Sequence, residues 1–347
     1  MQKPRDIKRS RIIVALSVIV GFWVLNLFAQ IFWGFIFMIA EPLTGAFGSG
    51  TGYYSYEFQF IGPVILALVA VVIYTLIAYS PIGISMAKSK AGIRPIMTEQ
   101  EKGYLEPLHD EVFDTIKEKF PDAKKKKLYM FDSPDINAFC MNQGSDIALH
   151  RGSIQALNTE ELKAVLAHEY AHAYYNDGLY STLYAGSAFM LPYVFFLPFL
   201  INFNSFMGIV GTGNIFAWGF AILIVWLIVK FWIFLMKIAL FPVLFAINLI
   251  VGMFEKQVLE AGQKFKEAGS YWFIQNIVFM MMSKEQEYRA DEFACYVGYK
   301  YGMQSALNLF YSMDFQPVYG VMNRLLAEHP SNPKRIANVE SFEVDSY

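Results

Sequence analysis

Four long stretches without a charged residue constrain this chain more than any other feature. The 347-residue sequence has no Asp, Glu, Lys or Arg within the ranges Ile12–Ala40, Phe58–Ala87, Gly178–Val229 and Ile238–Phe254. A membrane-spanning helix needs about 20 apolar residues, so the first three stretches are long enough to cross a bilayer. Because they are continuously apolar and do not alternate, they exclude a β-barrel as well as a simple soluble protein. Charged residues, 17% of the chain, are concentrated between them, so we expect membrane and water-soluble parts to be interleaved.

Basic residues beside the first two stretches predict how the chain is oriented in the bilayer. They are Lys3, Arg5, Lys8, Arg9 and Arg11 before the first stretch, and Lys88, Lys90 and Arg94 after the second. The intervening loop 41–57 has no lysine or arginine. Because basic residues collect on the cytoplasmic side, we expect a multi-pass protein of the cell (inner) membrane with its N-terminus in the cytoplasm. The net charge of −2 does not favour nucleic acid as a partner.

The charge pattern divides the chain into four predicted segments. They are 1–87, with spans at about 12–40 and 58–87; 88–177, the first soluble part; 178–254, with spans at about 181–201 and 215–235 and a further apolar piece at 238–254; and 255–347, the second soluble part. Polar residues at 202–205 and 211–214 favour a turn between the third and fourth spans. The piece 238–254 is compatible with a fifth span, a re-entrant segment or a helix lying along the membrane.

The first soluble part shows local signals for helices and a hairpin. Thr98 and Glu101 form a capping-box pattern that predicts a helix running toward Phe120. The runs 127–131 and 136–142 have strand character, and 146–150 is the expected return strand of a hairpin. Another helix is predicted to begin at Asn158 or Thr159.

The second soluble part is predicted to be helical. Ser283 and Gln286 suggest a capping box that opens a helix there. Among the remaining residues, His109 is expected at the surface and His150 in a structural role. Cys140 and Cys295 are too few for a disulfide framework and are expected to be small buried apolar residues.

The sequence His168-Glu169-Tyr170-Ala171-His172 carries the clearest chemical signal. On an α-helix the two histidines lie about 40° apart around the axis, so both imidazoles can reach one metal ion. Glu169 then lies beside the metal without being a necessary ligand. This is the arrangement of two zinc ligands and a general base in metalloproteases. A chance match is disfavoured because the chain has only five histidines and this pair falls on one helix face.

A catalytic zinc needs a third protein ligand, and Glu287 is the candidate. Asp291 lies four residues further along the chain, on the same helix face, where it could accept a hydrogen bond from a ligand histidine. The alternative is a solvated charged face, which the spacing alone favours slightly because Glu285 and Glu292 also lie nearby.

These motifs, in this order, resemble those of the HtpX-like membrane zinc metalloproteases, which are relatives of the CAAX prenyl proteases. The resemblance rests on the zinc-helix motif, two following spans, Glu287 with Asp291, His329-Pro330 with Arg335, Asn137-Ala138-Phe139, and Gly152. The chain departs from that pattern by a longer 238–282 stretch and by Ser331 where a second proline is usual.

The resemblance implies an α+β fold, in which a zincin-like (gluzincin) cytoplasmic catalytic domain is combined with membrane helices. One zinc ion per chain is implied at His168, His172 and Glu287, with Glu169 as the base. Catalytic His329 would donate to an oxyanion, and Arg335 would line the site with Asp291. Asn137, Ala138 and Phe139 would form an edge strand that pairs with extended substrate.

The proposed zinc ligands also limit the membrane topology. His172 and Glu287 must reach the same ion from one side of the bilayer, so an even number of spans must separate them. Spans at 181–201 and 215–235 already satisfy this rule, which predicts that 238–254 does not cross alone.

The sequence therefore predicts an integral-membrane zinc endopeptidase that cleaves membrane-associated or misfolded polypeptides on the cytoplasmic side. A role in protein quality control is implied by the resemblance alone. Two alternatives stay open: a dedicated processing protease for one substrate, such as a lipidated peptide, and a membrane scaffold or chaperone that retains the zinc fold without turnover.

Overall fold

The computed structural model describes residues 2–44, 56–141, 146–210, 226, 273–313 and 330–343. The chain divides into two compact units, each considered by itself. The first comprises Met1–Val18, Val69–Phe189 and Ile274–Tyr347, and the second comprises Ile19–Leu68 and Met190–Phe273. The segment 238–254 and His329 lie outside the described residues, as does all of the predicted span 215–235 except Trp226.

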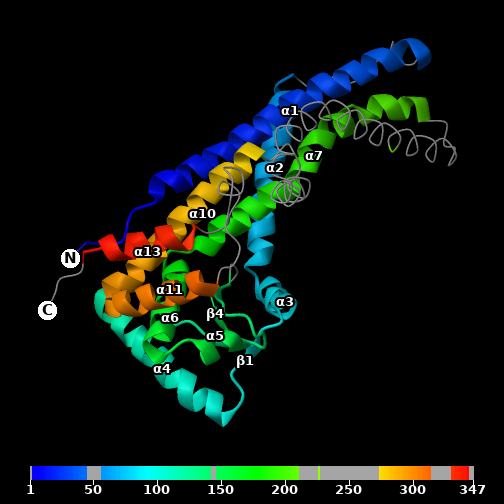
Figure 1. Cartoon of the computed structure of the whole chain (residues 1–347). Coiled ribbons are helices and arrows are strands. Elements are labelled where there is room, and N and C mark those ends of the chain that lie inside the picture. The colour runs from blue at the N-terminus through cyan, green and yellow to red at the C-terminus, as the bar shows by residue number, and fades with distance from the viewer. Residues whose placement is uncertain are drawn as a thin grey trace, which may run out of the picture. The chain divides into compact units, whose positions relative to one another are not determined.

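Three long apolar helices correspond to the first three charge-free stretches. They are α1 (Lys8–Thr44), α2 (Tyr56–Ala78) and α7 (Asp177–Val210), shown in Figure 1. Of the described residues, Lys8–Phe32 and Ile61–Ala78 form helices that are long and apolar enough to cross a membrane.

The second charge-free stretch is not a single helix, so the expectation of one span from 58 to 87 is wrong at its C-terminal end. Helix α2 ends at Ala78, and α3 (Pro81–Ala91) begins three residues later. Ser80 separates them: its hydroxyl accepts a hydrogen bond from the Gly83 N–H at 3.1 Å, and Pro81 follows at the first helical position.

The turn predicted at 202–205 is also absent, because α7 continues as a helix to Val210. Isolated Asn and Ser residues lower helix propensity only slightly, unlike the glycines at 211 and 213. The other predicted turn, 211–214, lies outside the described residues.

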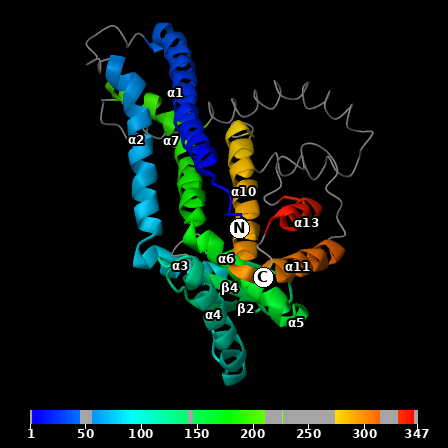
Figure 2. The same ribbon diagram turned by 90° about the vertical axis from the view of Figure 1, so that its left-hand side faces the viewer.

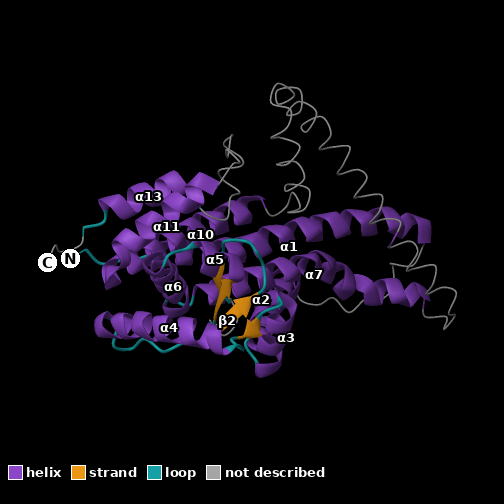
Figure 3. Cartoon of the chain, turned by 60° about the horizontal axis from the view of Figure 1, so that its bottom comes forward, coloured by secondary structure: helices purple, strands orange, loops and turns teal. Residues whose placement is uncertain are grey.

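A four-stranded sheet lies within the first unit (Figure 3). Its strands are β1 (Arg94–Pro95), β2 (Leu128–Phe131), β3 (Ala138–Cys140) and β4 (Ile147–His150), in the order β1-β2-β4-β3. The predicted hairpin is present: β3 pairs antiparallel with β4, with Ala138 opposite Leu149 and Cys140 opposite Ile147. Strand β4 is entirely buried and also pairs with β2 in parallel, which leaves β3 at an edge.

The predicted capping box at Thr98 and the predicted helix start at Asn158 or Thr159 are both present, and the second start also has a capping box that was not predicted. Helix α4 (Glu99–Lys119) begins at the Thr98/Glu101 box and ends against Phe120. After the short helix α5 (Arg151–Ala156), helix α6 (Thr159–Tyr174) begins at a box made by Asn158 and Glu161. Helix α6 carries the histidine pair and is buried along almost its whole length.

Within its described residues, 273–313 and 330–343, the second soluble part has helices α10 (Phe273–Ala294), α11 (Lys300–Met313) and α13 (Asn332–Ser341), with a π-helical turn, η3 (Cys295–Tyr299), between the first two (Figure 2). The helix start predicted at Ser283 is wrong, because α10 is already helical from Phe273 and Ser283 lies in its interior. The apolar residues that precede Ser283 continue the helix, so no cap is needed there.

Helix α11 packs directly on α6, and a glycine makes this possible. A Cβ at Gly302 would lie 2.3 Å from the Glu160 carbonyl oxygen, so only glycine allows this approach. The shared core includes Leu162, Leu166 and Leu307, all fully buried. The first and second soluble parts, which are far apart in sequence, therefore pack together at the helix that carries the histidines.

His109 is buried, so the expectation of a surface position is wrong. It lies on α4 with only 5% of its surface exposed, and its Nε2 is 2.6 Å from the hydroxyl of Tyr170 on α6. Burial lowers the pKa of His109 to about 4, so the ring is neutral where it pairs with the tyrosine hydroxyl.

Candidate metal centre

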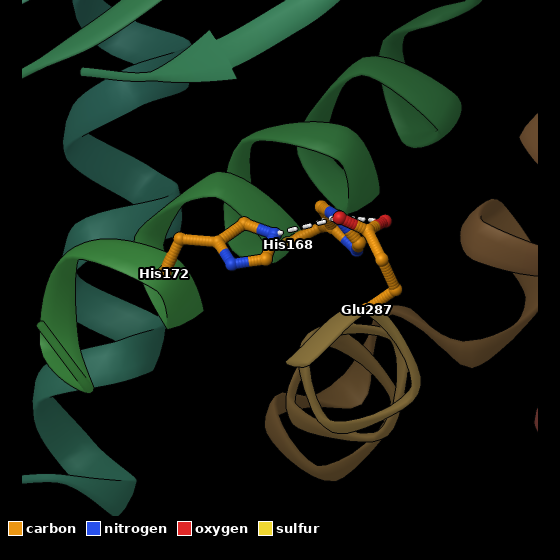
Figure 4. A group of neighbouring side chains, drawn as sticks. All are labelled: His168, His172 and Glu287. Atoms are coloured by element: carbon orange, nitrogen blue, oxygen red, sulfur yellow. Dashed lines mark hydrogen bonds and ion pairs between the residues drawn. The ribbon is translucent and has the colours of Figure 1, made fainter. Parts of the chain in front are cut away.

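Helix α6 presents two histidines toward a carboxylate on α10. The Nε2 atoms of His168 and His172 are 3.2 Å apart. Glu287 Oε2 is 3.6 Å from His168 Nε2, and Glu287 Oε1 is 3.6 Å from His172 Nε2. Figure 4 shows the three side chains turned toward one another. One ligand atom from each lies within 4.8 Å of the others.

The chemistry and spacing of this cluster fit zinc. Two imidazoles and one carboxylate are a donor set found in catalytic zinc sites, where a fourth position is kept for water or substrate. With ligand distances of about 2.0–2.2 Å, tetrahedral geometry separates ligand atoms by about 3.3–3.5 Å. The two histidine nitrogens, 3.2 Å apart, are close to this separation, and each lies 3.6 Å from a different oxygen of Glu287.

His168 is oriented by a buried carboxylate and an arginine. Its Nδ1 is 2.9 Å from Asp291 Oδ1. Arg335 donates to both oxygens of Asp291, from Nε at 2.9 Å and from Nη2 at 2.6 Å. The Arg335 Nη1 also lies 3.3 Å from Glu287 Oε2. A proton kept on Nδ1 by Asp291 would leave Nε2 to bind a metal ion.

His172 has an equivalent partner that the sequence analysis missed. Its Nδ1 is 2.9 Å from Asp177 Oδ2. The other oxygen of Asp177 accepts hydrogen bonds from Arg289 and, at 2.7 Å, from Arg11. Asp177 is only 5% exposed. Each histidine of the cluster is therefore held by a carboxylate that is itself held by arginine.

Asp177 reaches His172 because the chain turns sharply after α6. If α6 continued, a residue five positions after His172 would point about 140° away from it around the axis. Instead Asn176 adopts a left-handed conformation with φ of 54°, which ends α6 and starts α7 at Asp177. Asparagine tolerates this conformation better than most residues with a side chain. The only sequence signal for this position is an Asn-Asp-Gly run directly after the zinc helix.

Burial and neighbouring charges shift the pKa values of this cluster. Burial lowers the pKa of His168, but interactions with Asp291 and Glu287 outweigh it and raise the pKa to about 10. Burial raises the pKa of Asp291 and of Asp177, but their arginine and histidine partners hold both values below the ordinary one. Both aspartates are therefore ionised and can accept hydrogen bonds from the two histidine rings.

Glu169 follows the ligand candidate His168 on α6. It is buried, with 7% exposed. Burial and the Glu169 carboxylate both raise the pKa of the Cys140 thiol on β3, and the same carboxylate contributes to the raised pKa of Arg335. Glu169 is therefore within electrostatic reach of both β3 and Arg335.

Strand β3 presents part of its backbone away from the sheet. The Asn137 carbonyl accepts from the His150 N–H, and the Met141 N–H donates to the Asp146 carbonyl. Bonding alternates along an antiparallel pair, so the backbone groups of Ala138 and Cys140 face the open edge. The side-chain oxygen of Asn137 accepts from the Ala138 N–H at 2.9 Å.

The structure agrees with two further sequence expectations and modifies a third. His150 is buried, and its ring packs against Phe131 and Phe139 as a structural residue would. Cys295 is fully buried, but Cys140 is only half-buried. Gly152 lies so close to the Pro134 carbonyl oxygen that a Cβ would be 2.0 Å from it.

Comparison with known proteins identifies a peptidase family and two similar proteases. Residues 99–343 match the sequence model of peptidase family M48. A 145-residue stretch is 28% identical to the Protease HtpX homolog of Streptococcus uberis and covers 41% of this chain and 46% of that protein. A 110-residue stretch is 34% identical to the Protease HtpX homolog of Pelotomaculum thermopropionicum and covers 31% of this chain and 36% of that protein. The matched stretches thus span less than half of each of these relatives.

A solved structure is also similar. The crystal structure of S. mikatae Ste24p aligns with 92% of this chain and 67% of that chain, with 16% sequence identity and a TM-score of 0.45. The family match and the HtpX homologues confirm the resemblance on which the sequence analysis relied.

Proposed function

The chain belongs to peptidase family M48, and from this premise we propose that it is a zinc-dependent endopeptidase anchored in a membrane. The observation that carries the proposal is the convergence of His168, His172 and Glu287 within 4.8 Å. These three residues would hold one zinc ion. Asp291 and Asp177 would orient the histidines, with Arg335 beside them.

Glu169 is the proposed general base. When bound, zinc would supply Lewis-acid chemistry, lowering the pKa of water toward about 7 and polarising a peptide carbonyl. The Glu169 carboxylate would accept the proton of the attacking water and pass it to the departing amine. His329, which lies outside the described residues, is proposed as a donor to the developing oxyanion.

The edge strand β3 is the proposed docking site for substrate. An extended peptide would pair with the outward-facing backbone groups of Ala138 and Cys140, by strand addition to the sheet. The side chains of Asn137 and Phe139 would then flank it. Because Glu169 lies within reach of this strand, a peptide held there would pass the proposed base.

The site is proposed to lie in the cytoplasm, close to the bilayer of the cell membrane. Asp177 contacts His172 and is also the first residue of α7, whose apolar sequence predicts a membrane span. Membrane-associated and misfolded polypeptides are therefore the proposed substrates, and protein quality control is the proposed role.

Replacing Glu169 tests the proposal. We expect Glu169→Gln to retain zinc but to lose cleavage of casein and self-cleavage by a factor of at least 100, since general-base catalysis contributes about 10²–10⁴-fold. Glu118→Gln, an exposed change on α4, is the matched control and should cleave like the parent. If Glu169→Gln cleaves as fast as the parent protein, the chain is not an enzyme of this kind.

The same experiment separates the two alternatives. A scaffold or chaperone that retains zinc without turnover would show no cleavage in any form, including the parent. A dedicated processing protease would leave casein intact and cleave one membrane protein, which a comparison of membrane proteomes with parent and Glu169→Gln enzymes would reveal.

A further inference from the structure

Arg11 connects the N-terminal segment to the metal centre. It lies near the start of α1, and its Nη2 donates to Asp177 Oδ1 and to the Tyr175 carbonyl, each at 2.7 Å. Its guanidinium also lies over the ring of Tyr180, 4.2 Å from the centroid. The side chain is only 16% exposed, so it is not a freely moving surface arginine.

The acceptor of this arginine is the carboxylate that orients His172. Asp177 uses Oδ2 for His172 and Oδ1 for the two arginines, Arg11 and Arg289. A carboxylate with one oxygen fixed by two cations cannot rotate without losing these bonds. Arg11 therefore restricts the direction in which Asp177 meets the imidazole, and the imidazole in turn directs its Nε2 toward Glu287.

The rest of the N-terminal segment is also bound to this unit. Arg5 donates from its backbone N–H to Glu292 Oε2 at 2.7 Å and from Nε to Oε1 at 2.8 Å, and its guanidinium lies over the ring of Tyr288. Ile7 is fully buried. Figure 1 shows the segment running beside α13, where Gln2 and Glu343 exchange hydrogen bonds.

We propose that Arg11 is a positioning residue for the metal ligand His172 and acts through Asp177. Residues 2–11, whose basic side chains the sequence assigns only to membrane orientation, are then also a structural component of the metal centre. This inference rests on the proposed function in one respect, namely that His172 is a metal ligand.

Zinc affinity of the purified full chain tests the proposal without any measurement of turnover. The dissociation constant would be measured by competition with a chromophoric chelator. We expect Arg11→Met to weaken zinc binding about tenfold, the lower end of the effect of losing a partner of a metal ligand. Arg11→Lys keeps the charge and one donor, so it should recover part of the affinity. Arg9→Met removes an exposed charge two residues away and should bind zinc like the parent.

A double-mutant cycle tests the route through Asp177. If Arg11 acts only by holding Asp177, the variant with both Arg11→Met and Asp177→Asn should bind zinc as weakly as Asp177→Asn alone. Losses that multiply would overturn this route, and so would unchanged affinity in Arg11→Met. Should Arg11→Met not fold, Arg11→Gln takes its place, with the same order of affinities expected: Arg above Lys above Gln.

The absorption spectrum of the cobalt(II)-loaded protein gives a second readout. A change of ligand direction at His172 should alter the visible bands in Arg11→Met but not in Arg9→Met. Identical bands in both variants would contradict a positioning role. Failure of this inference leaves zinc binding by the parent and the effect of Glu169→Gln intact, whereas failure of the proposed function would appear as a parent that binds no zinc.

Discussion

The two histidines of the candidate metal centre are supported by the same chemistry in different structural settings. His168 is held by Asp291, which shares a regular helix with Glu287 and is fully buried. His172 is held by Asp177, which follows a left-handed residue and depends on an arginine from the start of the chain. Asp291 is positioned by the regular helix that it shares with Glu287. Asp177 is positioned by a turn and a long-range contact. We therefore expect the first support, Asp291, to be the more rigid and the more costly to remove.

The largest effect is expected from Asp291→Asn. The change leaves the buried Arg335 with only the Glu287 carboxylate, at 3.3 Å, as an ionised partner, and disrupting a buried pair in this way costs up to about 3–5 kcal/mol. Zinc affinity should also fall by about 10–100-fold. Thermal unfolding and chelator competition measure the two effects. Asp114→Asn, an exposed aspartate on α4, is the control, and equal behaviour of the two variants would contradict a supporting role for Asp291.

The second largest effect is expected from acidification, which should lower the stability of the fold through His109. This residue contacts neither of the two aspartates that hold the histidines. Burial lowers the pKa of His109 to about 4 from an ordinary value near 6.5. Its neutral form therefore stabilises the fold fully above pH 6.5, and this contribution is lost as the pH falls toward 4. At pH 4.5 the loss amounts to about 2–3 kcal/mol.

His109→Gln isolates this contribution, because glutamine can still form a hydrogen bond with the Tyr170 hydroxyl and does not titrate. Melting temperatures between pH 7 and pH 4.5 should fall less for His109→Gln than for the parent. Parallel curves for the two proteins would show that the acid sensitivity comes from elsewhere, with the ionised carboxylates of the two supports as the next candidates.

Asp177→Asn should have a smaller effect on stability than Asp291→Asn. Arg289 stays in contact with the ring of Tyr175, 3.9 Å from its guanidinium, and Arg11 keeps the Tyr175 carbonyl. Arg11 therefore keeps a hydrogen-bond acceptor and Arg289 keeps an aromatic contact, so the loss of their shared carboxylate is partly compensated. Zinc affinity should fall about tenfold. A loss of stability equal to that of Asp291→Asn would remove the distinction between the two supports.

The smallest effect is expected at the turn itself. Asn176→Ala should cost about 1 kcal/mol, since a left-handed conformation is unfavourable for residues with a Cβ, and should weaken zinc binding by displacing Asp177. Asn176→Gly is the matched control, because glycine adopts this conformation freely. If both variants bind zinc equally well, the turn does not set the position of Asp177.

Helix periodicity explains which parts of the site the sequence predicted. His168 with His172, and Glu287 with Asp291, are pairs four residues apart, and each pair falls on one face of a helix wherever that helix packs. The capping boxes of α4 and α6 and the β3–β4 hairpin are local in the same sense. Their geometry depends on neighbouring residues, so it can be derived before the fold is known.

Two wrong predictions show how local signals mislead. The acidic neighbours of His109 suggested an exposed residue, yet Leu105, His109, Val112 and Ile116 form one buried stripe along α4. The helical spacing of these residues was visible in the sequence, and it indicated the position of His109 better than the neighbouring charges did. The supposed cap at Ser283 failed because a capping pattern identifies a helix start only where no helix precedes it.

The sequence by itself determined several elements of this protein: its apolar helices and the zinc-helix motif follow from local periodicity and composition. The choice of Glu287 and Asp291 over a solvated charged face rested on the resemblance to the HtpX-like metalloproteases. Only the tertiary structure decided that Asp177 supports His172 and that Arg11 supports Asp177. The first contact depends on one backbone angle at Asn176, and the second joins residues far apart in the chain. Neither has a periodic signal, because both arise from the packing of segments against one another.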